Sequence, residues 1–147
     1  MVTLIIGNKG TGKTKKLIDM ANAALKATNG NVVFVDHGAK LTYDIRQPAR
    51  LINAKEYAIQ GFDALYGFLS GLCAGNYDVT DILVDGTLKT GGRDFAQFAV
   101  FIDRINALSD KTDTRFIFSV SADESEMPAS VMETVCKEVG TCKVAPF

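Results

Sequence analysis

The fold of this 147-residue chain is decided by Gly7-Asn8-Lys9-Gly10-Thr11-Gly12-Lys13-Thr14. The stretch matches the phosphate-binding pattern G-x-x-x-x-G-K-[ST]. Residues 2–6 before it are apolar and rich in β-branched side chains, which is typical of a buried parallel strand, and a helical pattern begins at Thr14. The pattern requires a strand, a glycine-rich loop and a helix in this order, so we expect a phosphate-binding loop here.

Each residue type in this loop has a separate physical reason. Glycines at 7, 10 and 12 let backbone N–H groups turn inward around an anion, and Asn8, Lys9 and Thr11 complete the loop. Lys13 would place its ammonium on the β- and γ-phosphate oxygens, and the Thr14 hydroxyl would ligate Mg²⁺ at the positive end of a helix. The pattern therefore predicts ATP and Mg²⁺ as ligands. The alternative is a glycine-rich turn with an exposed lysine.

Composition predicts a single domain over residues 1–147. The chain is 47% apolar and 22% charged, which is enough to bury one core, and its formal net charge is −1. Because the longest basic block is 13–16, interrupted by threonine, neither nucleic acid nor an anionic membrane surface is indicated as a partner. No membrane span or leader pattern is visible, so we expect a cytoplasmic protein. Cys73, Cys136 and Cys142 show no C-x-x-C spacing, which favours reduced thiols.

Hydrophobic periodicity predicts a three-layer α/β/α domain with a mainly parallel sheet of at least five strands. The secondary structure of residues 38–58 is the least clearly predicted, with strand candidates at 41–43 and 50–52. The other expected elements are a helix over 14–28, a strand over 31–36, a helix over 61–74, a strand over 79–85, a loop over 86–92, a helix with its apolar face from Phe95 to Ile105, a strand over 115–120, a helix from Pro128 with its apolar face reaching Val139, and a last strand over 141–145.

Ile82-Leu83-Val84-Asp85 resembles the second nucleotide signature of P-loop NTPases, in which an aspartate at the end of an apolar strand holds Mg²⁺ through a water. Aspartate also ends many strands because it favours turns. The order of elements resembles the division of these proteins in which another strand inserts between the two signature strands. That resemblance implies that Ser119 or Ser121, at the end of the inserted strand, senses the γ-phosphate. The chain is also similar to small stand-alone bacterial P-loop proteins sometimes labelled as twitching-motility-type ATPases, which implies nucleotide binding.

The chain departs from this division at Gly86. Active members usually carry a glutamate there, directly after the aspartate, to orient or deprotonate the attacking water. Asp36, at the end of the second strand, could replace it as the catalytic carboxylate. Further candidates are Asp123, Glu124 and Glu126, and all of these residues can equally be explained as turn residues.

Each of the other polar residues near the expected site has a functional and a purely structural interpretation. Lys89 and Arg93 could neutralise phosphate charge in the manner of an arginine finger, or could be solvated loop cations. His37, the one histidine, could contact a nucleotide or could be polar loop surface.

Three functions remain open from the sequence. The first is a Mg-ATP-binding protein that hydrolyses ATP slowly, with Lys13, Asp36 and Asp85 as catalytic residues, and signals to an unidentified protein partner through nucleotide-dependent loops. The second is a small phosphotransferase in which Asp36 accepts the proton of a substrate hydroxyl. The third is a non-enzymatic interaction module that retains the fold. The sequence does not determine the oligomeric state.

Overall fold

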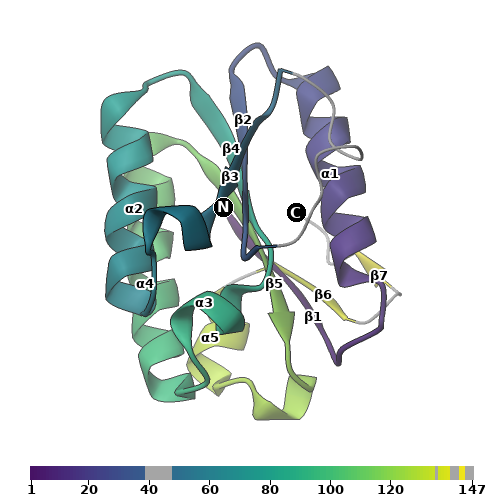
Figure 1. Ribbon diagram of the computed structural model, residues 1–147. Coiled ribbons are helices and arrows are strands. Elements are labelled where there is room, and N and C mark those ends of the chain that lie inside the picture. The colour runs from purple at the N-terminus through teal and green to yellow at the C-terminus, as the bar shows by residue number, and fades with distance from the viewer. Residues whose placement is uncertain (39–47, 135, 140–142, 145–147) are drawn as a thin grey trace.

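A seven-stranded sheet forms the centre of the structure (Figure 1). The computed structural model describes residues 1–38, 48–134, 136–139 and 143–144. The strand order is β3-β2-β4-β5-β1-β6-β7, and all neighbouring strands are parallel except β6 and β7. The strands are β1 (Val2–Gly7), β2 (Asn31–Asp36), β3 (Arg50–Asn53), β4 (Val79–Val84), β5 (Arg115–Ser121), β6 (Cys136–Val139) and β7 (Lys143–Val144).

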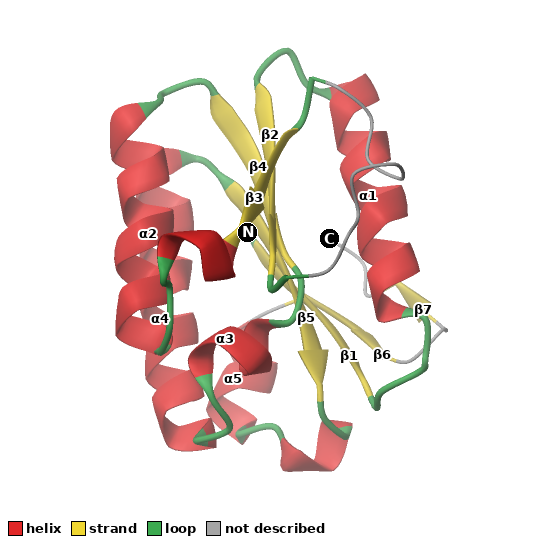
Figure 2. Ribbon diagram, in the orientation of Figure 1, coloured by secondary structure: helices red, strands yellow, loops and turns green. Residues whose placement is uncertain are grey.

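Helices cover both faces of the sheet (Figure 2). One face is covered by α1 (Lys13–Ala27), and the opposite face by α2 (Phe62–Gly75) and α4 (Phe95–Thr112). The shorter helices are α3 (Thr87–Gly91), α5 (Ala129–Thr134), and the 3₁₀ turns η1 (Ala54–Tyr57) and η2 (Glu124–Glu126). This arrangement confirms the predicted three-layer α/β/α domain. None of the helices in the described part of the chain has the length and apolar character needed to cross a lipid bilayer.

The strands read as continuous apolar runs because both of their faces are buried. In β2, Val33 and Val35 belong to the apolar cluster under α2 and α4, whereas Val32 and Phe34 belong to the cluster under α1. Successive side chains of a strand point to opposite faces, so a sheet with a helical layer on each side favours apolar residues at most of its positions. Cys73 lies in the larger cluster as a buried free thiol.

The strand that follows α4 lies between the two signature strands. Strand β5 pairs with β1 from Val2↔Phe116 to Gly7↔Ser121, and with β4 up to Val84↔Phe118. The carboxyl ends of β1, β5, β4 and β2 consequently meet at one edge of the sheet. The predicted order of strands is confirmed, and the fold is compatible with that of P-loop NTPases.

The predicted C-terminal helix is too long. Helix α5 ends at Thr134, and Cys136–Val139 form β6, which pairs in parallel with β1 from Thr3↔Cys136 to Ile6↔Val139. The apolar spacing from 131 to 139 fits a helix, but the open edge of β1 offers backbone hydrogen bonds that only a strand can take up. Strand β3 confirms the candidate at 50–52, and β7 falls within the predicted last strand. The candidate at 41–43 lies outside the described residues.

The predicted loop over 86–92 contains a helix, α3, which its sequence alone does not indicate because one helical turn is marginal without tertiary contacts. Its contacts with α2 stabilise it. The backbone N–H of Gly61 donates to the carbonyl of Thr90 at 2.8 Å, and a Cβ built on Gly91 would lie 2.2 Å from Cε1 of Phe62. Gly91 therefore lets α3 approach the start of α2 closely.

Replacement of Gly91 by alanine tests this close approach. The added Cβ would overlap the buried Phe62 ring, so we expect Gly91→Ala to lower the free energy of unfolding by about 1–3 kcal/mol in urea denaturation. Gly67→Ala is the matched control, because Gly67 is an exposed helical residue of α2 with open space at its Cβ position. We expect it to raise stability by about 0.5–1 kcal/mol. Equal effects of the two substitutions would contradict the packing argument.

Candidate functional site

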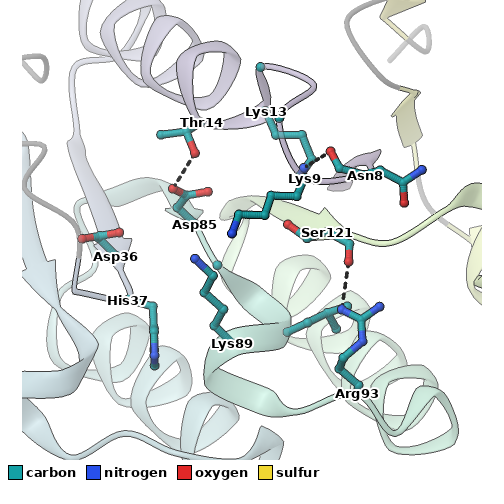
Figure 3. A pocket seen from close by; sticks show the side chains of 14 residues that line it. Asn8, Lys9, Lys13, Thr14, Asp36, His37, Asp85, Lys89, Arg93 and Ser121 are labelled. Atoms are coloured by element: carbon teal, nitrogen blue, oxygen red, sulfur yellow. Dashed lines mark hydrogen bonds between the residues drawn. The ribbon is translucent and has the colours of Figure 1, made fainter.

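A pocket of about 780 Å³ opens at the carboxyl edge of the sheet, where the ends of β1, β2, β4 and β5 meet (Figure 3). Ligands of parallel α/β sheets bind at this edge, and the volume is in the range of small-molecule sites. The lining residues come from four regions that are distant in sequence. The residues are Asn8, Lys9, Gly10, Gly12, Lys13, Thr14, Asp36, His37, Asp85, Gly86, Leu88, Lys89, Arg93 and Ser121.

The loop after β1 has the backbone shape that its glycines allow. Gly10 and Gly12 both have φ of +86°, a left-handed conformation that L side chains rarely adopt. Gly12 precedes α1 directly, so the helix begins at Lys13 and its free N–H groups face the pocket. The Thr11 hydroxyl donates to the carbonyl of Asn8 at 2.8 Å and holds the loop closed on itself. Backbone N–H groups at a helix N-terminus of this kind are able to bind an anion.

Lys13 is turned into this loop. Its side chain is only 6% exposed, and its Nζ donates to the carbonyl of Asn8 at 2.9 Å. Burial lowers the pKa of the Lys13 ammonium from its usual 10.5, the negative charge of Asp85 opposes this shift, and the positive charge of Lys89 adds to it. A buried ammonium with another cation nearby is stabilised by an anion, so the environment of Lys13 favours an anionic ligand.

Asp85 connects the two predicted signatures. The Thr14 hydroxyl donates to its Oδ2 at 3.0 Å, and the Ser119 hydroxyl donates to its Oδ1 at 2.6 Å. Ser119 also accepts from the backbone N–H of Gly86 at 3.0 Å. The carboxylate is thus fixed on both oxygens at the edge of the pocket.

The oxygen pair of Thr14 and Asp85 fits a magnesium ion. The Thr14 hydroxyl could ligate Mg²⁺ directly, and the Asp85 carboxylate, 3.0 Å from that hydroxyl, could hold the ion through a water; oxygen ligands of this kind are the ones that this cation prefers. Magnesium sites that bind nucleotides use few protein ligands, since phosphates and waters supply the rest. Within the described residues no cluster of three or more His, Cys, Asp or Glu side chains could hold a metal by itself.

Three of the predicted site residues lie outside the large pocket. Gly7 and Thr11 line a smaller hollow of about 560 Å³ on the other side of the loop, beside Asp123. Ser119 is buried behind Asp85 and lines neither hollow, whereas Ser121 lines the large pocket. The geometry makes Ser119 a residue that orients Asp85.

The candidate catalytic carboxylates are separated by the structure. Asp36 is 4% exposed and lines the large pocket at the end of β2, one strand away from Asp85. Asp123 and Glu126 instead form the capping box of η2, where hydrogen bonds from Ser125 lower the pKa of Asp123. Glu124 lies at the smaller hollow. Of the candidates, Asp36 alone among the described residues lines the pocket of Lys13 and Asp85.

Of the pocket residues around α3, His37 was a candidate from the sequence and Leu88 was not. In Figure 3, His37 points away from the centre of the pocket. Its Nδ1 lies 2.9 Å from Oγ1 of Thr90. Leu88 lines the pocket from α3, a position that could not be found without predicting that helix. The pocket is otherwise polar and charged. Its described cations are Lys9, Lys13, Lys89 and Arg93, and its described carboxylates are Asp36 and Asp85.

The absence of a glutamate at position 86 has a steric reason. Gly86 has φ of +66°, and a Cβ at this position would lie 3.1 Å from Cβ of His37. A side chain at 86 would therefore combine a left-handed backbone with a tight contact. The backbone conformation and the close contact at this turn between β4 and α3 both favour glycine.

Gly86→Glu tests this constraint. We expect the substitution to lower the free energy of unfolding by about 1–2 kcal/mol in urea denaturation, since the left-handed conformation costs that much for an L residue. Gly71→Glu places the same side chain on an exposed helical position of α2 with open space around it, so stability should change by less than about 0.5 kcal/mol. A Gly86→Glu protein as stable as the unsubstituted chain would refute the steric explanation.

Neither a scan against models of protein families nor a search of curated proteins finds a match to this chain. The function proposed below therefore depends on the pocket residues and on a sheet order that is compatible with the P-loop NTPase fold.

Proposed function

We propose that the protein binds ATP with Mg²⁺ at this pocket and hydrolyses it slowly, as a nucleotide-dependent switch. The observation that carries the proposal is the contact of Thr14 with Asp85, 71 residues apart in sequence, beside the buried Lys13. A turn with no ligand has no need to bring a helix-start hydroxyl, a fixed carboxylate and a buried ammonium into one pocket.

The charges of the pocket support a polyphosphate as the ligand. Four cationic side chains and two carboxylates line its described part, and the N-terminus of α1 adds a partial positive charge. Lys13 would exchange its bond to the Asn8 carbonyl for phosphate oxygens. Thr14 and Asp85 would hold Mg²⁺, which neutralises phosphate charge when bound.

The proposed reaction is the attack of water on the γ-phosphate. Asp36 would accept the proton of that water, because it is the candidate base that lines the pocket. Ser119 keeps Asp85 in position through its Oδ1. The position that usually carries the water-orienting glutamate is Gly86, and this accounts for a slow reaction in the proposal.

A switch requires that ligand binding change the structure at a distance from the pocket, and α3 is suited to transmit such a change. It contributes Leu88 and Lys89 to the pocket, and Thr90 contacts both His37 after β2 and Gly61 before α2. A shift of α3 on nucleotide binding would therefore reach the start of α2, where a protein partner could read it. The partner is not identified.

Ligand binding is tested by thermal unfolding with and without Mg-ATP. A ligand at about 100 times its Kd stabilises the folded state by about 2.7 kcal/mol, so the melting temperature should rise. The Lys13→Ala protein should lose most of this rise, and so should the unsubstituted protein with EDTA in place of Mg²⁺. Lys111→Ala, an exposed change in the last turn of α4, should retain it. No rise with millimolar Mg-ATP would refute nucleotide binding.

The role of Asp36 is tested by phosphate release under single-turnover conditions. We expect Asp36→Asn to reduce the rate by about a hundredfold or more, because general bases contribute at least this much. Binding of Mg-ATP should be retained, which a thermal shift of unchanged size would show. An unchanged rate in Asp36→Asn would remove Asp36 as the base without affecting the assignment of the nucleotide site.

A further inference from the structure

Two cations of the pocket, Lys89 and Arg93, contribute to its positive charge but have no individual role in the reaction proposed above. Both follow Asp85 in the sequence, and both line the pocket. The structure places them differently, however, and the difference assigns them separate roles.

Arg93 is bound at the edge of the pocket by the turn that follows β5. Its Nη1 donates to the carbonyl of Ser121 at 2.9 Å, its Nη2 lies 3.7 Å from Oε2 of Glu126, and its guanidinium stands 5.7 Å from the centre of the Phe95 ring. In Figure 3 its guanidinium lies beside Ser121, away from Thr14 and Asp85. These contacts connect the start of α4 to β5 and η2, so Arg93 holds this turn in place.

Lys89 instead extends toward the centre of the pocket. Figure 3 shows its chain reaching from α3 toward Asp85 and toward Lys9 on the opposite wall. Its ammonium is close enough to Lys13 for the two positive charges to interact. The side chain is exposed to the pocket and to solvent, so it is accessible to a ligand.

The base of Lys89 is held firmly although its tip is free to reach a ligand. Helix α3 is fixed to β5 through its N-cap residue Gly86, whose backbone N–H donates to the Ser119 hydroxyl at 3.0 Å, and to α2 through the bond from Gly61 to the Thr90 carbonyl. His37 contacts Thr90 from a third side, and Gly91 packs against Phe62. These contacts fix the point from which Lys89 extends, so its flexible side chain can bring the ammonium to a charge at the centre of the pocket.

Building on the proposed function, we infer that Lys89 contacts the γ-phosphate and neutralises its negative charge during transfer. The positive charge needed for this step is then supplied by the chain itself. In the reaction, the water oxygen forms a bond to the γ-phosphorus while the bond to the β–γ bridging oxygen breaks. ADP leaves with that electron pair, and Asp36 takes the proton of the water. Lys89 stabilises the charge on the γ-phosphoryl oxygens throughout. A cation supplied in this way removes the need for a residue from a second molecule.

The inference is tested by comparing affinities for a non-hydrolysable ATP analogue and for ADP, both with Mg²⁺. Loss of a contact to the γ-phosphate should weaken binding of the analogue in Lys89→Ala by about tenfold to a hundredfold and leave ADP binding within about twofold. Lys89→Arg should recover part of the affinity for the analogue. Arg93→Ala should instead lower the melting temperature and should not separate the two ligands. Lys111→Ala serves as the control for loss of one positive charge.

The rate of phosphate release provides a second readout. Lys89→Ala should lower it by about a thousandfold, the lower bound for a charge of this kind. The rate per molecule of the unsubstituted protein should not depend on protein concentration. A rate that rises with concentration would show that a second copy supplies the positive charge, and this would overturn the inference. Equal losses of affinity for the analogue and for ADP in Lys89→Ala would also overturn the inference. If the unsubstituted protein binds neither nucleotide, the proposed function itself fails, which is a distinct result.

Discussion

The structure of the pocket depends on the fixed carboxylate of Asp85. Its Oδ2 accepts from Thr14 at the start of α1, and its Oδ1 accepts from Ser119 on the neighbouring strand. Both contacts require the register of β4 against β5, in which Val84 is opposite Phe118. A slip of one residue would turn Ser119 to the other face of the sheet, because side chains alternate along a strand. The packing of the apolar strands between two helical layers thus determines the position of a single polar group.

Glycine conformations connect this carboxylate to the surrounding backbone. Gly10 and Gly12 shape the loop that leads into α1, and Gly86 turns the chain from β4 into α3. All three have positive φ, so each turn is sharp enough to bring the next helix directly over the strand ends. The turn at Gly86 disfavours a side chain at this position, and it also brings the first turn of α3 to the pocket. The same conformation therefore removes one functional group and positions another.

Electrostatics and packing act against each other in this pocket. Lys13 is buried, and Lys89 lies near enough to add to the effect that burial has on its pKa. Like charges placed together destabilise a folded chain unless counter-charges or ligands compensate them. Asp85 opposes part of this effect, and Arg93 is neutralised at the edge of the pocket by Glu126 and the Ser121 carbonyl. The remaining positive charge faces the open centre, as a site for anions requires.

The sequence by itself determined the layered α/β fold, the glycine-rich loop at 7–14 between a strand and a helix, and the place of Asp85 at the end of a central strand, because apolar periodicity and glycine spacing are local properties. It also named Asp36 as a candidate base, and Lys89 and Arg93 as candidate phosphate contacts without distinguishing these two from each other. Only the tertiary structure decided that 136–139 form a strand, that 87–91 form a helix, and that Ser119 lies behind Asp85. Each of these results depends on partners far away in the chain, namely the open edge of β1, the start of α2 and the end of β4, and no local pattern can specify such partners.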